Sequence, residues 1–152
     1  MIEADSDSAD YDPPARLRRM PSWLASQVAR RAGELVGEAL AEEGARRQHF
    51  TVLCSLAEQG AASQAALGRR LWIDRSDLHA ILGELERDRY VARVRDEHDR
   101  RRNVVTVTPA GLDALERLAN RVEAAQKTLL QPLSASDRRE FRRLLKKLVE
   151  GS

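Results

Sequence analysis

The chain of 152 residues contains a single cysteine, Cys54, and no apolar run approaching the ~20 residues that a membrane-spanning helix requires. One cysteine excludes an intrachain disulfide. The first residues are acidic and lack the apolar segment of a secretory signal, so we expect a soluble cytoplasmic protein without a membrane partner. Aromatic residues make up only 4% of the chain, so its core must come mainly from leucine, valine and alanine on amphipathic helices.

Patterns that support catalysis are also missing. The sequence has no glycine-rich phosphate loop, no nucleophile elbow and no paired histidine–carboxylate motif. The histidines His49, His79 and His98 share no metal-ligand spacing with one another or with Cys54. We therefore expect neither an enzyme nor a metal site, and no cofactor. Cys54 lies in an apolar helical stripe, which favours a packing role over a redox sensor.

Charge is unevenly distributed along the chain. Residues 1–14 hold five acidic side chains and no basic one, whereas the remainder has 26 basic against 19 acidic residues, a net charge of +7. Of the basic residues 23 are arginine, the side chain best suited to phosphate, although a high-GC genome would enrich it too. Because residues 1–20 are polar, we expect them to form a flexible acidic tail.

Apolar spacing predicts a mainly helical fold. Residues from Ser22 onward carry apolar side chains three and four apart, until Gly44 breaks the pattern, and a second helix ends at Gly60. A short helix begins at Ser63, and a longer one with a clean inner stripe begins at Asp74. Two such helices in succession are typical of a helix-turn-helix.

A hairpin with a charged tip follows the second of these helices. Between Val91 and Pro109, two segments with alternating β-branched residues flank residues 96–102, which contain neither glycine nor proline. Thr108 then caps a long helix with Pro109 in its first position, and Ser134 begins the last helix.

The predicted fold is mainly α with a small β-wing, in one domain over residues 21–152. A winged helix-turn-helix head (46–108) is flanked by helices at 21–44 and 109–152. Both flanking regions have apolar faces that need cover, and a second copy of the chain is the simplest cover. We therefore expect dimerisation helices at both ends and a homodimer.

Four short motifs occur within residues 85–111: Leu85-Glu86, Val91-x-Arg93, Asp96-x-x-Asp99-Arg100-Arg101 and Thr108-x-x-Gly111. Together they resemble the pattern of the MarR family of transcriptional regulators, and the order of helices resembles that family over roughly 21–151. The resemblance implies a homodimeric repressor that binds a pseudo-palindromic operator in double-stranded DNA. It also implies possible release by an unknown small-molecule effector.

The helix from Asp74 is the expected recognition helix, whose first turns would touch base edges. Arg75 could form a bidentate hydrogen bond with guanine or bind a phosphate. Asp77 could accept a hydrogen bond from cytosine N4 or orient Arg75. Ser63 and Gln64, at the start of the preceding helix, are expected phosphate contacts. The predicted outward-facing contacts on the recognition helix are Arg75, Ser76, Asp77, His79 and Ala80.

Two positions depart from the family pattern. Ala80 stands where the family often has an arginine, so base preference cannot be carried over. Arg89 stands where the family usually has a helix-ending glycine. The helix end must therefore use a less favourable left-handed residue or a different turn.

The hairpin tip carries three consecutive arginines, Arg100, Arg101 and Arg102. An extended loop of this kind can reach the minor groove, where A·T-rich tracts concentrate negative potential. We expect Asp96 and Asp99 to fix the guanidinium directions through Arg93, Arg95 or one arginine of the triplet. The resemblance assigns this bracing role to Asp99.

The two tryptophans are open to other interpretations. Trp23 lies near the junction of the dimer arm and the head, where effectors of the family often bind, so it is either a pocket wall or a packing residue. Trp72 is expected to plug the turn before the recognition helix.

The alternative to a DNA-binding regulator is a winged-helix interaction module that does not read DNA. The acidic tail, the net charge of +2 and Ala80 would suit this alternative.

Overall fold

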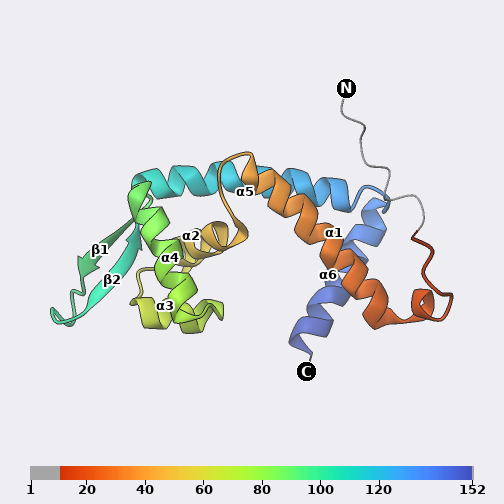
Figure 1. Cartoon of the computed structure of the whole chain (residues 1–152), viewed down its shortest axis with the longest axis horizontal. Helices are drawn as coiled ribbons and strands as arrows, with labels where there is room; N and C mark the ends of the chain where they lie inside the picture. Colours follow the sequence, from red (N-terminus) through yellow and green to blue (C-terminus); the bar gives the residue numbers. More distant parts are fainter. Residues whose placement is uncertain (1–10, 152) are drawn as a thin grey trace.

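A computed structural model describes residues 11–151 of the chain (Figure 1). The described part contains a short 3₁₀ helix, six α-helices and two strands. The α-helices and strands follow the order that the sequence predicts. Their bounds are η1 (Leu17–Arg19), α1 (Pro21–Ala41), α2 (Arg47–Gln59), α3 (Gln64–Leu71), α4 (Arg75–Arg87), β1 (Val91–Arg95), β2 (Asn103–Val107), α5 (Pro109–Leu129) and α6 (Ala135–Glu150).

Four helices begin where polar side chains cap them. Ser63, Asp74, Thr108 and Ser134 each accept a hydrogen bond from a backbone N–H in the first turn of α3, α4, α5 and α6 respectively. Each cap satisfies an amide that would otherwise lack a partner, and stabilises its helix by about 1 kcal/mol in typical cases. The helix starts predicted at these four residues are confirmed.

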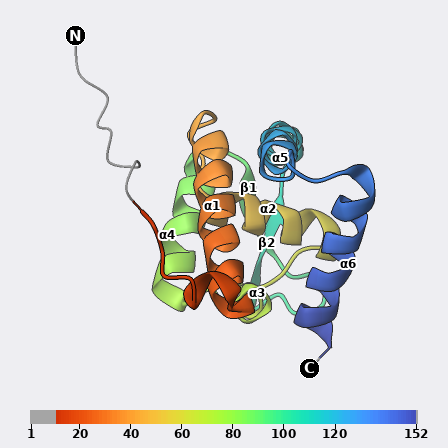
Figure 2. The same cartoon turned by 90° about the vertical axis from the view of Figure 1, so that its right-hand side faces the viewer.

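Helix α5 runs along the top of the molecule and connects its two ends (Figure 1). One end is a head made of α2, α3, α4 and the hairpin, and the other end carries α6. Helix α1 packs along α5. Seen from the end of α5, α1 and α6 lie apart on either side of the molecule (Figure 2).

The core lies mainly in the head and joins the helix-turn-helix to the hairpin. Burial of each large apolar side chain there stabilises the fold by roughly 1.5–3 kcal/mol. Its fully buried members come from α1, α2, α3, α4 and β2: Leu40, Val52, Leu53, Leu67, Leu78, Leu82 and Val105.

Backbone pairing attaches the hairpin to the head. The strands are antiparallel, with Val91 opposite Val107 and Arg95 opposite Asn103. Ala62, just before α3, adds a bridge to β2: its N–H donates to the Val105 carbonyl at 3.1 Å and its carbonyl accepts from the Val105 N–H at 2.7 Å. The base of the hairpin is therefore fixed, while its tip extends away from the head (Figure 1).

The start of α5 packs tightly against the chain that leaves α4. The Thr108 hydroxyl donates to the Arg89 carbonyl at 2.6 Å and accepts from the Gly111 N–H at 3.0 Å. A Cβ atom on Gly111 would collide with the Tyr90 carbonyl oxygen. The Thr108-x-x-Gly111 motif therefore has a mechanical reason, since threonine ties the two segments together and glycine lets them approach.

The structure corrects two expectations. Leu17–Arg19 form η1, although the sequence placed them in a flexible tail, and residues 1–10 of that tail lie outside the described residues. Trp72 does not plug the turn between α3 and α4. Its backbone is left-handed, with φ of 55°, and its side chain is 95% exposed.

The helices at the two ends of the chain expose apolar side chains. On α6, Leu148 is 78% and Val149 80% exposed, and Leu24 on α1 is 45% exposed. Such a face is costly to leave in water. Its cover by a second copy stays a prediction. Within residues 11–151, no helix combines the length and the apolar character needed to cross a membrane.

Candidate nucleic-acid interface

The first turn of α4 is held by one carboxylate. Asp74 Oδ1 accepts from the N–H groups of Ser76 at 2.9 Å and Asp77 at 3.0 Å, and from the Ser76 hydroxyl at 2.8 Å. These bonds, that of the Asp77 amide first, lower the pKa of Asp74 to about 2. An ionised cap also suits the positive end of the helix dipole. The start of the predicted recognition helix is therefore rigid.

Helix α4 divides into a buried and an exposed face as the sequence predicts. Leu78, Ile81 and Leu82 are buried, while the predicted contact positions are exposed. The hydrogen bond with Asp74, and then the charge of Asp74, raise the pKa of Asp77. The exposed side chains are Arg75, Ser76, Asp77, His79 and Ala80.

A hollow of about 1170 Å³ lies beside α3 and α4. It brings together four of the predicted contact residues, Gln64, Arg75, Ser76 and His79, whereas Ser63, Asp77 and Ala80 are outside its lining. Ser63 is half-buried, and its oxygen caps α3 by accepting from the Ala66 N–H at 3.2 Å. The hollow is thus a mainly apolar recess, with several polar side chains, at the start of the predicted recognition helix.

The aspartates of the wing brace the backbone. Asp96 Oδ1 accepts from the His98 N–H and Asp99 Oδ1 from the Arg101 N–H, both at 3.0 Å. The Arg102 N–H donates to the Asp99 carbonyl at 3.0 Å, which closes the turn. Side chains of this type make turns without glycine or proline. Within residues 11–151 neither carboxylate forms an ion pair, so the expected bracing of guanidinium groups is not what the structure shows.

Arg93 contacts the head and does not contact a wing aspartate. Its Nε lies 2.6 Å from Glu86 Oε1 on α4, and its Nη1 donates to Gln64 Oε1 on α3 at 3.4 Å. The expectation that Arg93 braces the wing through an aspartate is wrong, because its guanidinium pairs with Glu86. Arg93 therefore joins the wing to α3 and α4 of the head.

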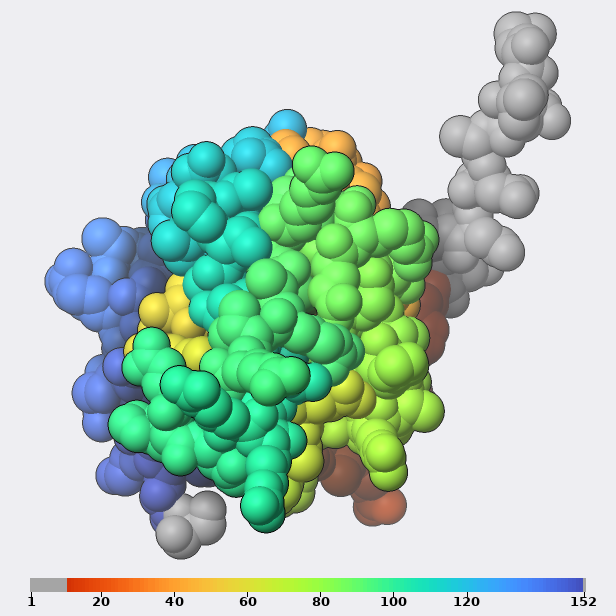
Figure 3. All heavy atoms as spheres, turned by 90° about the vertical axis from the view of Figure 1, so that its left-hand side faces the viewer, coloured from red at the N-terminus to blue at the C-terminus, as the bar shows by residue number. Residues whose placement is uncertain are grey.

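The three arginines of the wing tip project from this braced turn. All three are exposed, and none forms an ion pair among the described residues. In the space-filling view the wing and the segment entering α4 both project from the same end of the head, with a recess between them (Figure 3). The wing arginines therefore add positive charge at the end of the head that also carries the start of α4. The residues are Arg100, Arg101 and Arg102.

A second cluster, which sequence reasoning missed, links α4 to the start of α2. Glu84 Oε2 lies 2.6 Å from Arg46 Nη2 and also contacts His49 Nε2. The hydrogen bond from Arg46, and then that from His49, hold the pKa of Glu84 below its usual range. His49 Nδ1 accepts from the Arg46 N–H at 2.9 Å and so caps α2. No local pattern reveals the two contacts of Glu84, because its partners Arg46 and His49 are more than 30 residues away in the sequence.

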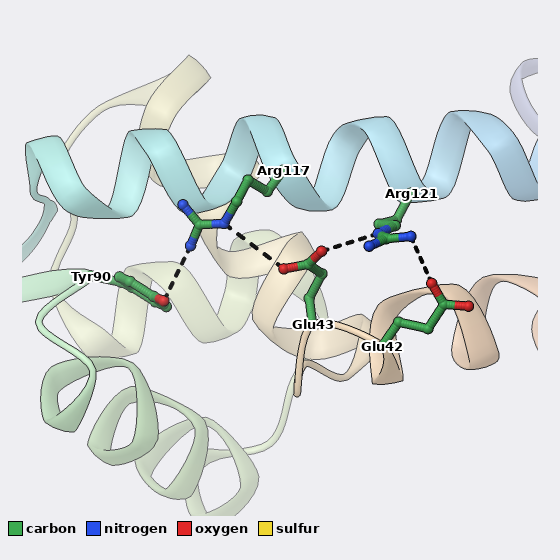
Figure 4. A network of polar contacts seen from close by, with 5 residues as sticks. All are labelled: Glu42, Glu43, Tyr90, Arg117 and Arg121. Carbon is green, nitrogen blue, oxygen red and sulfur yellow. Dashed lines mark hydrogen bonds and ion pairs between the residues drawn. The ribbon is translucent and has the colours of Figure 1, made fainter.

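A third network joins α5 to the end of α1 and to Tyr90, just before β1 (Figure 4). Arg121 on α5 contacts Glu42 at 2.7 Å and Glu43 at 3.0 Å, just beyond the end of α1. Arg117 lies 3.8 Å from Glu43 and donates to the Tyr90 hydroxyl at 3.4 Å. Exposed pairs of this kind stabilise the fold little. They link α5 to the end of α1 and to the base of the wing.

Two further candidate residues, Trp23 and Cys54, lie away from the surface of α4 and the wing. Trp23 is half-buried on α1 and does not line the hollow beside α4, so its role in an effector pocket stays a prediction. Cys54 is half-buried on α2, and burial, followed by the charge of Glu58, raises the pKa of its thiol. A raised pKa disfavours the reactive thiolate, which supports packing over redox sensing.

Comparison with known proteins gives a family and several relatives. A family model described as MarR family matches residues 44–102, from the end of α1 to the wing tip. The transcriptional activatory protein BadR of Rhodopseudomonas palustris is 35% identical over 103 residues, which cover 65% of this chain and 59% of BadR. The chain thus matches less than two thirds of that relative's length.

Two solved structures are similar over nearly their whole length. One is a probable transcriptional regulator from Pseudomonas aeruginosa, 28% identical with a TM-score of 0.75, covering 88% of this chain and 99% of that one. The other is PcaV from Streptomyces coelicolor in complex with its natural ligand, 26% identical with a TM-score of 0.71, covering 91% and 98%.

Fold and comparisons together define the class. The head is a winged helix-turn-helix, mainly α with a two-stranded wing. Over residues 44–102 the chain is similar to the MarR family, and its fold is similar to that of the Pseudomonas aeruginosa regulator.

Proposed function

We propose that this protein is a cytoplasmic, homodimeric transcriptional regulator that binds double-stranded DNA sequence-specifically. The observation that carries the proposal is that α4 and the wing share one end of the head (Figure 3). Arg75 and His79 at the start of α4 are exposed and line the hollow. Two copies would place their α4 helices in successive major grooves, with half-sites about 10 base pairs apart. The operator would then be pseudo-palindromic.

The two parts of this surface would do different work. Side chains of the first turn of α4 would reach base edges, with Arg75 suited to guanine and His79 to a base or a phosphate. Ser63 and Gln64, at the N-terminus of α3, would hold a phosphate. The wing arginines would enter the flanking minor groove and sense its width. Sequence preference would thus come from α4, and the wing would add affinity without reading base identity.

We further propose that the protein represses transcription and that a small-molecule effector releases it. PcaV was solved with a natural ligand, which supports an effector, whereas BadR is named as an activator, so the direction of control needs its own test. An effector would act by favouring one spacing of the two heads over another. A reporter behind the selected DNA site should be less active when the protein is present.

The DNA-binding proposal can be tested by selection from a random duplex pool with the purified full chain. We expect enrichment of an inverted repeat with half-sites about 10 base pairs apart. Arg75→Ala and His79→Ala should change the enriched sequence, whereas a phosphate contact would lower recovery of every sequence alike. Failure to enrich any DNA would contradict the proposal and favour a protein-interaction module.

A further inference from the structure

Trp72 stands out as a large aromatic side chain with no packing role. It is 95% exposed, although tryptophan is among the more buried residues on average. The other tryptophan, Trp23, is half-buried on a different part of the molecule. Leaving an indole in water has an energetic cost, which a binding role would offset.

The backbone fixes this exposure. Trp72 ends α3 in the left-handed region, with φ of 55°, and its N–H donates to the Gly68 carbonyl. The Ile73 N–H donates to the same carbonyl at 3.1 Å. A Cβ on Gly68 would lie only 3.1 Å from the Ile73 carbonyl oxygen, so the turn is closely packed at this point. The turn is held from both sides, and the indole projects from a rigid base.

Trp72 lies at a hollow that is mainly apolar and also carries polar and basic side chains. It lines the hollow beside α4 together with Gln64, Arg69, Arg75 and His79. In the part of the chain that the structure describes, neither Arg69 nor Arg75 belongs to an ion pair. Unpaired guanidinium groups around an exposed indole suit a polyanion with apolar sugar surfaces, which is the chemistry of a nucleic-acid backbone.

We propose that Trp72 is a contact residue for the DNA backbone, with its ring packed on a deoxyribose and its Nε1–H donating to a phosphate oxygen. This inference rests on the proposed function. Trp72 lies outside the first turn of α4, so when that turn enters the major groove the indole meets the groove wall, which is sugar and phosphate. Indole nitrogen can only donate, and phosphate oxygen only accepts.

A neutral contact has a distinctive effect on the salt dependence of binding. Removing a charged side chain that neutralises a phosphate lowers the slope of log affinity against log salt by about 0.9, because fewer counterions are released. Removing Trp72 should lower affinity without changing this slope. It should also act equally on all sequences, because sugar and phosphate are the same at every base pair.

The first test compares Trp72→Ala, Trp72→Phe and Arg69→Ala with the wild type by anisotropy, using the duplex that the wild type enriches. Trp72→Ala should bind roughly tenfold more weakly at every salt concentration, with the slope unchanged. Trp72→Phe keeps the ring and loses the N–H, so its affinity should be intermediate. Arg69→Ala is the charged comparison from the same hollow, and a lower slope there would show that the assay detects the removal of one charge from the phosphate backbone. Thermal melting should be unchanged in both Trp72 variants, because the side chain makes no core contact.

The second test uses tryptophan emission. In a Trp23→Phe chain, Trp72 is the only emitter, and addition of the duplex should quench its emission and shift it to shorter wavelength. A Trp72→Phe chain reports Trp23 alone and should respond less. The contact is overturned if the wild type binds DNA while Trp72→Ala binds with the same affinity and Trp72 emission does not change. The proposed function would still stand in that case. Absence of any DNA binding by the wild type would overturn both.

Discussion

At the scale of single residues, aspartates next to the proposed DNA surface organise backbone. Asp74 caps α4, while Asp96 and Asp99 each accept an N–H two residues further along the wing. Acids beside a polyanion are unfavourable unless they do structural work. Here they replace glycine and proline in shaping the turns from which arginines project.

Replacement of Asp74 by asparagine tests the cap. The pKa of Asp74 is about 2 in the fold against 3.8 for the ordinary group, so its ionised form stabilises the fold above about pH 3.8 and this contribution is lost as the pH falls toward 2. Asp74→Asn still accepts hydrogen bonds but does not titrate. Urea midpoints measured from pH 5 to 2 should fall less steeply for this variant, while Asp113→Asn, on exposed α5 surface, should match the wild type. Equal steepness in all three would contradict this role.

Arg89 tests the end of α4. It has φ of 61°, and the Tyr90 N–H donates to the Leu85 carbonyl at 2.9 Å across it. Glycine adopts this conformation without steric cost, so Arg89→Gly should raise the free energy of unfolding by roughly 1 kcal/mol. Arg87→Gly, at the last residue of α4, should lower it instead, because glycine there gains no left-handed conformation and only loses helix propensity. Thermal or urea unfolding measures both, and a destabilised Arg89→Gly chain would show that the arginine has another role.

At the scale of elements, the close approach of α5 to the turn after α4 sets the position of the head. Gly111→Ala should lower the free energy of unfolding by roughly 2–3 kcal/mol, because the added Cβ meets the Tyr90 carbonyl and the backbone must shift. Gly83→Ala is the matched control: that glycine lies in α4 with nothing within 4 Å, so alanine there should stabilise by about 1 kcal/mol. Equal effects of the two changes in urea unfolding would contradict the close packing.

The elements themselves could be predicted from sequence, because their causes are local. Ser63, Asp74 and Thr108 cap helices through neighbours two or three residues away, and apolar spacing marks each buried face. Contacts between elements could not, since nothing local pairs Arg93 with Glu86. The same holds for Trp72: its aromatic character predicted burial, whereas the backbone conformation that exposes it depends on how α3 meets α4.

At the scale of the whole molecule, α6 tests the proposed dimer. Leu148 is 78% exposed, and in a dimer that covers this face it would be buried. Leu148→Asp should weaken dimerisation by roughly 30-fold or more, because a buried unpaired carboxylate costs several kcal/mol. Arg139→Asp places the same charge on the opposite side of α6 and should leave the dimer intact. Sedimentation velocity across a dilution series measures both, and a stable Leu148→Asp dimer would exclude this face from the interface.

The proposed function depends on α4 and the wing binding DNA together. Affinity for the selected duplex should therefore be measured against salt concentration, for the wild type and for a chain with Arg100, Arg101 and Arg102 changed to alanine. We expect weaker binding by the variant and a log–log slope lower by about 0.9 for each phosphate that the wing no longer neutralises, with the oligomeric state unchanged. An identical affinity and slope in the two chains would show that the wing does not bind DNA.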